Sequence, residues 1–193
     1  MKYLCILFSL LVVHTSAQNL KKFGIDTTQV VPDGLAAGLY APQFETLKKT
    51  ENTTLVVFIK GSWHKKDMKF LARLADSLQT SSPTPVDVVI VTTEKPEYNG
   101  KMTDIGPFKV VNDADQSIST AWDNLFVATQ GYVKRRAFFN RMKQEDRCET
   151  ANGKFNTNSC YLVSPTGKIL WRYFSLDGKS RPSVKEIVAA MKK

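Results

Sequence analysis

The segment LVVFIKGSWHKKD at residues 55–67 passes from an uninterrupted apolar, β-branched run into a polar stretch. Such a run is typical of a central strand that is covered on both faces. Apolar residues then recur at helical spacing and predict an amphipathic helix over residues 66–79, with its cations facing outward. A second β-branched run follows at residues 86–92. This order of strand, helix and strand predicts two parallel strands joined by a right-handed crossover.

The next elements are shorter. Residues 108–111 predict a third strand, and residues 115–122 predict a short helix that is capped by Asp113 or Asp115. The hydrophobic pattern then weakens at residues 127–158, which we interpret as an insertion.

The last part of the chain has clear turn and helix-capping signals. Residues 160–163 and 169–174 flank the turn sequence SPTG and predict an antiparallel hairpin. Ser183 and Glu186 have the spacing of a capping box and predict the start of a terminal helix.

The domain organisation follows from the composition and from the positions of glycines and prolines. The chain of 193 residues is 42% hydrophobic and 23% charged, which is typical of one globular domain. Residues 18–33 are a polar entry segment, and glycines and prolines in residues 34–47 predict a loop or hairpin that packs on the domain. We therefore assign residues 34–193 to one domain.

The first 17 residues have the zones of a secretory signal peptide. A lysine at position 2 precedes an apolar run at residues 3–13, and small residues end at Ala17, where we predict cleavage. No later apolar run is long enough to span a bilayer as a helix. The mature chain is therefore expected to be secreted or periplasmic.

Cleavage would remove Cys5 and leave Cys148 and Cys160 as the cysteines of the mature chain. An even pair in an oxidising compartment favours a structural disulfide. The alternative is a redox-active pair, although such pairs usually lie close together at the start of a helix.

The full chain carries a formal charge of +9, and removal of Lys2 with the signal peptide leaves about +8. Export makes nucleic acid an unexpected partner. A basic exported protein can instead bind an anionic glycan, a membrane surface or an acidic protein, or its charge can serve solubility alone.

Cations concentrate in the insertion, where one helix is predicted over residues 134–145. An ordinary amphipathic helix explains this pattern if Phe138 and Met142 pack inward. The sharper hypothesis is a basic docking surface made of Lys134, Arg135, Arg136, Arg141, Lys143 and Arg147.

Four motifs resemble, in the right order, those of a known family. They are GLYAPQF at residues 38–44, VVFIKGSW at residues 56–63, YLVSPTGKI at residues 161–169 and DGKSRP at residues 177–182. The sequence resembles the thioredoxin fold, and more narrowly the peroxiredoxin-like branch of the alkyl hydroperoxide reductase and thiol-specific antioxidant superfamily. The resemblance implies an α/β thioredoxin-like three-layer sandwich, with a central mixed β-sheet flanked by helices.

The resemblance also implies a redox site, and there the sequence departs from the family. After Trp63, His64 stands where the family has its reactive cysteine, and Asp67 stands where a second cysteine occurs. Asn158 or a neighbour takes the place of the family's cis-proline. None of these residues forms a sulfenic acid or a mixed disulfide, so we expect no catalytic residue at these degenerate redox-site positions.

Other chemistry is conceivable at the same place. His64, Lys65 and Lys66 lie near the predicted helix start, where free N–H groups favour an anion. The plain alternative is a solvated basic helix end. His64 and Asp67 share a helical face, but two ligands do not make a tight metal site, so we expect neither a metal nor another cofactor.

The sequence thus favours an exported, catalytically degenerate thioredoxin or peroxiredoxin-like protein with a non-catalytic binding role. A purely structural or matrix-associated protein is one alternative. A thiol-disulfide oxidoreductase or antioxidant that uses Cys148 and Cys160 is the other.

Overall fold

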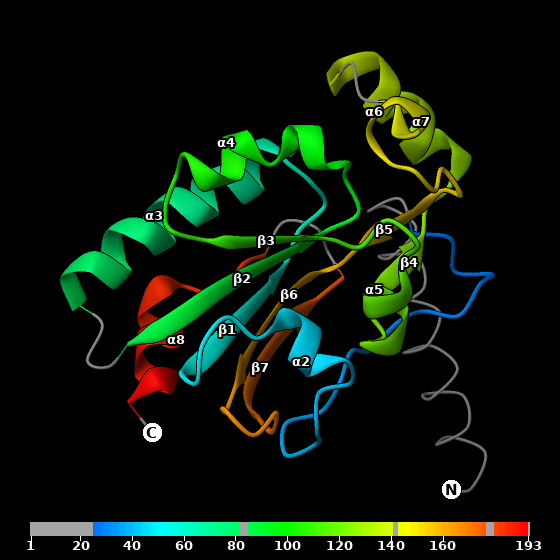
Figure 1. The fold of residues 1–193 in the computed structure, drawn as a ribbon. Coiled ribbons are helices and arrows are strands. Elements are labelled where there is room, and N and C mark those ends of the chain that lie inside the picture. Colours follow the sequence, from blue (N-terminus) through cyan, green and yellow to red (C-terminus); the bar gives the residue numbers. More distant parts are fainter. Residues whose placement is uncertain (1–24, 82–84, 141–142, 177–179, 193) are drawn as a thin grey trace, which may run out of the picture.

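The computed structural model describes residues 25–81, 85–140, 143–176 and 180–192. The predicted signal peptide at residues 1–17 lies outside the described residues, as does the beginning of the entry segment. The described part contains a mixed sheet with helices on both faces, as Figure 1 shows.

Five strands form the central sheet in the order β3-β2-β1-β6-β7. Their bounds are β1 Thr53–Phe58, β2 Val86–Thr92, β3 Lys109–Asn112, β6 Asn158–Val163 and β7 Ile169–Ser175. Strand β2 pairs in parallel with β1 and β3, whereas β6 pairs antiparallel with β1 and β7. The predicted α/β class, the crossover and the late hairpin are all confirmed.

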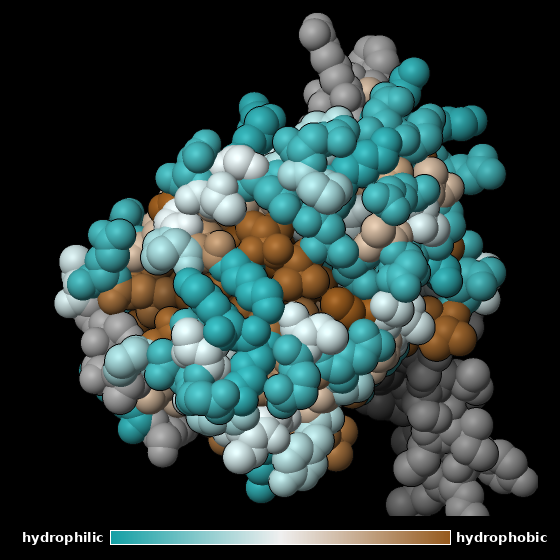
Figure 2. Space-filling model, viewed as in Figure 1, coloured by the Kyte–Doolittle hydropathy of each residue, from teal (hydrophilic) through white to brown (hydrophobic). Residues whose placement is uncertain are grey.

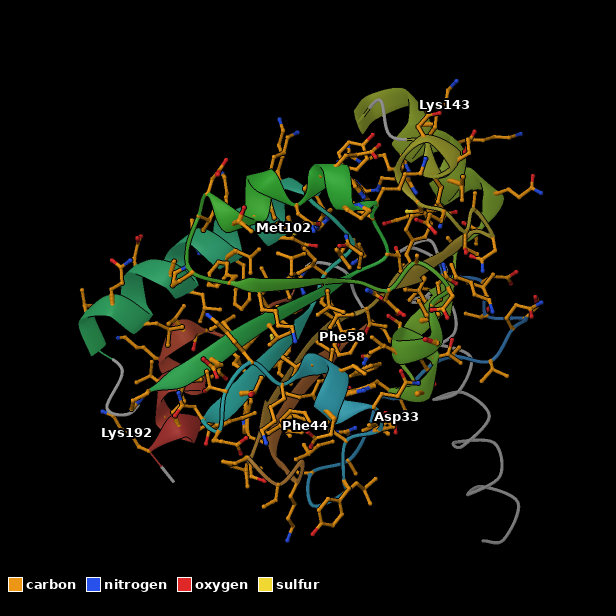
Figure 3. The ribbon with its side chains drawn as sticks, in the orientation of Figure 1. Asp33, Phe44, Phe58, Met102, Lys143 and Lys192 are labelled. Atoms are coloured by element: carbon orange, nitrogen blue, oxygen red, sulfur yellow. The ribbon has the colours of Figure 1, made fainter. Side chains whose placement is uncertain are left out.

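The central strand β1 sends alternate side chains to two cores. Leu55 and Val57 belong to the core under the helices α3 (Lys65–Ser81) and α8 (Val184–Met191). Val56 and Phe58 belong to the core on the opposite face, with residues of α2 (Phe44–Leu47) and α5 (Ser117–Ala121). Phe44 and Phe58 of this second core are labelled in Figure 3. Burial on both faces explains why β1 is apolar throughout.

The two long helices follow their sequence patterns. In α3 the apolar residues Leu71, Leu74 and Ala75 are buried, as the helical spacing predicts. Helix α8 starts with the predicted capping box, in which Ser183 and Glu186 exchange hydrogen bonds between side chains and backbone N–H groups. A 3-10 turn, η1 (Pro96–Tyr98), and a short helix, α4 (Gly100–Thr103), connect β2 to β3.

The insertion forms a separate lobe. Strands β4 (Leu125–Val127) and β5 (Lys154–Asn156) pair antiparallel. In sequence they flank the helices α6 (Gln130–Asn140) and α7 (Gln144–Arg147). The structure has these two helices where the sequence predicts one, because Lys143 is extended and interrupts the helical path. Figure 1 shows both helices standing away from the central sheet, and Lys143 lies at their outer end in Figure 3.

The lobe has its own small core of Ile25, Phe126, Ala128, Tyr132 and Phe155. Trp63, from the loop after β1, packs against this core. The insertion is thereby attached to the segment that connects β1 to α3.

The segment at residues 34–47 lies along β7. Gly38 and Leu39 exchange backbone hydrogen bonds with Ile169, and Phe44 begins the helix α2. The predicted extended loop is therefore correct up to α2, a helix that the sequence pattern did not predict.

Hydrophilic residues cover most of the face seen in Figure 2, with hydrophobic residues showing between them near the middle. Among the described helices, none has the length and the apolar character needed to cross a membrane.

Candidate functional site

The site lies where β1 gives way to α3. At Gly61 the backbone has a φ of 137°, a conformation that side-chain-bearing residues rarely adopt. A Cβ atom there would lie 2.6 Å from the carboxyl carbon of Glu94, so the chain makes this turn only with glycine. The turn places Trp63 and His64 directly before the first turn of α3.

Asp67 is the centre of a buried polar cluster. Its side chain is fully buried and accepts a hydrogen bond of 2.9 Å from the backbone N–H of Lys60. The Nδ1 atom of His64 lies 2.6 Å from Asp67 Oδ1. Arg181, which is 114 residues further along the chain, donates to the same oxygen through its Nη2 group. The cluster joins the start of α3 to the segment before α8.

The charge of Asp67 is stabilised by its neighbours. Burial alone raises the pKa of this carboxyl, but the positive charge of Arg181 and the hydrogen bond with His64 together hold it well below its usual range. Asp67 is therefore ionised at neutral pH, as the first turn of a helix also favours.

Asn158 belongs to the same neighbourhood. Its Oδ1 atom accepts a hydrogen bond of 3.0 Å from Lys60 Nζ, and its Nδ2 group donates to the carbonyl of Ser180 at 3.3 Å. The described residues contain no cis peptide bond. Since Lys60 contacts both Asp67 and Asn158, these two residues, which are distant in sequence, are neighbours in the structure.

The insertion covers this place. The indole N–H of Trp63 donates to the carbonyl of Lys60 at 3.1 Å, and its ring packs edge-on against Phe155. Arg136 of α6 lies over Trp63, with 5.6 Å between the guanidinium carbon and the ring centre. His64 is only 6% exposed. A reactive group needs access to solvent and substrate, and this position has little.

A second buried ion pair holds the loop from the other side. Glu94 accepts from the backbone N–H of Ser62, and its Oε1 atom lies 2.6 Å from Arg147 Nε. Arg147 also donates to Ser62 Oγ at 2.7 Å and stacks 3.9 Å above the ring of Tyr98. The loop between β1 and α3 is thus bound by two buried ion pairs, through the backbone N–H of Lys60 and that of Ser62.

The predicted disulfide between Cys148 and Cys160 is wrong in this structure, where both are free thiols. Cys160 lies in the middle of β6, beside Val57, inside the core under α3 and α8. Cys148 instead follows α7, and its backbone forms an isolated antiparallel β-bridge with Glu94. Cys160 belongs to the core under α3 and α8, whereas Cys148 belongs to none of the hydrophobic clusters of the described residues, and their spacing in the sequence does not reveal this.

Neither thiol has the surroundings of a reactive cysteine. Burial raises the pKa of Cys160 to about 12, and burial also raises the pKa of Cys148. The thiolate is the reactive form, so both thiols are held in the unreactive form at neutral pH.

The residues of the predicted docking surface divide into two groups. Lys134, Arg135 and Lys143 are exposed. Arg136 and Arg147 instead face inward, onto the rings of Trp63 and Tyr98. The side chain of Arg141 lies outside the described residues.

The predicted anion-binding residues also separate. His64 turns into the protein toward Asp67, whereas Lys65 and Lys66 are exposed. Over the described part of the chain, no group of three or more histidine, cysteine or acidic residues is arranged to hold a metal ion.

Sequence reasoning missed the partners that define the site. Arg181 pairs with Asp67, and the backbone N–H of Lys60 donates to the same carboxylate. Glu94 pairs with Arg147 across 53 residues. The one available signal was Asp67 itself, an acid on the inward side of an otherwise apolar helical face, which requires a buried cation or several N–H donors.

No protein-family model matches this sequence, and no curated protein matches it either. Solved structures of peroxiredoxins are similar. The peroxiredoxin 6 of Arenicola marina aligns with a TM-score of 0.59 and 9% identity, over 82% of this chain and 73% of that chain. The PrxQ protein of Xylella fastidiosa aligns with a TM-score of 0.55 and 14% identity, over 86% of this chain and 98% of that chain.

A third structure, the yeast mitochondrial 1-Cys peroxiredoxin, aligns with a TM-score of 0.57 and 12% identity, over 82% of this chain and 75% of that chain. At these identities the similarity establishes the fold. The chain has a thioredoxin-like fold of the peroxiredoxin kind, as the four sequence motifs predict.

Proposed function

We propose that this protein is an exported binding protein built on a peroxiredoxin-like fold that no longer performs thiol chemistry. One observation carries the proposal: the start of α3 holds the buried cluster of His64, Asp67 and Arg181 instead of a thiol. A helix start activates a cysteine by stabilising its thiolate. Here the same place stabilises a carboxylate that is already paired.

The positions of the two described thiols support the same proposal. Cys148 and Cys160 are buried, both have raised pKa values, and neither lies at the start of a helix. An oxidoreductase that uses these two residues would have to expose both thiols and bring them together.

The proposal predicts that the reduced protein neither consumes hydrogen peroxide nor reduces insulin faster than a buffer blank that contains the same dithiothreitol. The matched control is the variant Cys148→Ser/Cys160→Ser, which should consume peroxide and reduce insulin at the same rates as the wild type. Turnover by the wild type that disappears in this variant would replace the proposal with the oxidoreductase alternative.

The binding role we propose is recognition of an anionic glycan by the outer face of the insertion. Lys134 and Arg135 are exposed on α6, and Lys143 is exposed at the start of α7. None of these three cations forms an ion pair with a described residue. An unpaired group of cations on a projecting lobe attracts a polyanion over a distance set by the salt concentration.

Heparin is the probe for this surface. The variant Lys134→Ala/Arg135→Ala should leave a heparin column at lower salt than Lys101→Ala/Lys168→Ala, which removes the same charge from exposed positions outside the lobe. Equal elution of the two variants would show that net charge, and not this surface, causes retention. Acidic vesicles and an acidic protein tested in the same way distinguish the other anionic partners.

A further inference from the structure

A cavity of about 570 Å³ lies between α3 and the start of α8. It is separate from the outer face of the insertion. Three cations of α3 line it at positions i, i+3 and i+7, which share one helical face: Lys66, Lys69 and Arg73. The fourth cation in its wall is Arg181.

The charges around this cavity are not balanced. Glu186 is the one acidic residue among the described lining residues, and Arg181 is already paired with Asp67, so the three cations of α3 face one carboxylate. That carboxylate is already engaged, since its Oε2 atom accepts from the backbone N–H of Ser183 at 2.6 Å. The three lysine and arginine side chains of α3 form no ion pair with any described residue. Like charges at this spacing repel one another unless an anion lies between them.

Arg181 has donor groups that no described residue satisfies. Its side chain is 10% exposed, and its Nη2 group donates to Asp67. Its Nε and Nη1 groups are buried and find no hydrogen-bond partner among the described residues. A buried guanidinium with unused donors is costly, and a charged acceptor or ordered water removes that cost.

Part of the remaining wall is apolar. The ring centre of Phe70 lies 5.6 Å from the guanidinium carbon of Arg181. Pro182 and Val184 line the cavity near the start of α8. The cavity therefore combines a cationic side with an apolar side, which suits a small molecule that has a charged group at one end.

We propose that the cavity between α3 and α8 binds a small monoester of a tetrahedral oxyanion, a phosphate or a sulfate ester. The three cations of α3 contact the oxyanion, Arg181 forms part of the wall while it stays paired with Asp67, and Phe70, Pro182 and Val184 pack against the organic part. Of the residues that the sequence singles out for an anion, only Lys66 lines this cavity.

The test is a calorimetric titration of the protein with phenyl phosphate and phenyl sulfate at low salt. Saturable binding of either ester supports the site, and the difference between the two identifies the preferred oxyanion. A phosphate ester should also bind more tightly at pH 8 than at pH 5, because its second ionisation lies near pH 6, whereas the sulfate ester should show no such change.

Two double variants give the matched comparison. Lys69→Ala/Arg73→Ala should lower the affinity at least about tenfold, because two charge-assisted contacts are lost. Lys65→Ala/Lys185→Ala removes the same charge from exposed positions on the same two helices that do not line the cavity, and it should change the affinity less than about twofold. The proposal is overturned if neither ester binds the wild type saturably at millimolar concentration, or if both double variants weaken binding equally.

Discussion

Replacement of Asp67 by asparagine is expected to lower the free energy of unfolding by about 4 kcal/mol at pH 7, because it leaves a buried cation without its counter-ion. Arg181 is 10% exposed and has no other acidic partner among the described residues. The substitution also removes the charged acceptor of His64 Nδ1. Urea unfolding followed by tryptophan fluorescence measures the change.

The matched control is Asp76→Asn, which removes the same charge from an exposed position on the same helix. A surface substitution of this kind should stay within about 0.5 kcal/mol of the wild type. If Asp67→Asn also stays within about 1 kcal/mol, the cluster does not hold the start of α3 in the way described.

The same carboxylate predicts the pH dependence of stability. Its pKa in the folded protein is lower than the ordinary value of 3.8, so the folded state gives up this proton more readily than the unfolded state. The stabilisation is complete above about pH 4 and is lost as the pH falls below that value toward the folded-state pKa. The free-energy difference between wild type and Asp67→Asn should therefore shrink from pH 6 to pH 3. A constant difference would contradict the lowered pKa.

Replacement of Glu94 by alanine should lower the free energy of unfolding by about 3 kcal/mol, because the backbone N–H of Ser62 and the guanidinium of Arg147 both lose a buried acceptor. Arg147 is 15% exposed and still stacks on Tyr98, so the effect should be smaller than that of Asp67→Asn. The control Glu97→Ala removes an exposed acid from the adjacent turn η1 and should have little effect. Equal stability of the two variants would contradict the structural role of Glu94.

Local patterns were enough to predict most of the fold. The apolar run of β1, the helical spacing in α3 and the capping box of α8 each act within a few residues, and each element forms as predicted. The thioredoxin-like arrangement as a whole came from the resemblance of the four motifs, taken in their order, to the peroxiredoxin-like family.

The site itself depends on contacts that the sequence does not express. Asp67 and Arg181 are 114 residues apart, and no local spacing relates them. The even number of cysteines and the oxidising compartment predicted the wrong pairing for Cys148 and Cys160, because two thiols can each be buried in a different part of the fold without meeting. In the insertion, Arg136 looks like a surface cation in sequence but lies on an aromatic ring.

The central claim is that the redox position of this fold holds an ion cluster and that the thiols are structural. The measurement that tests it most directly is the reaction of the chain from residue 18 onward with Ellman's reagent, first native and then in guanidinium chloride. The account predicts slow reaction in the native state, because both thiols are buried with raised pKa values, and two thiols per chain after unfolding. A thiol that reacts rapidly in the native protein, or the absence of free thiols after unfolding, would contradict it.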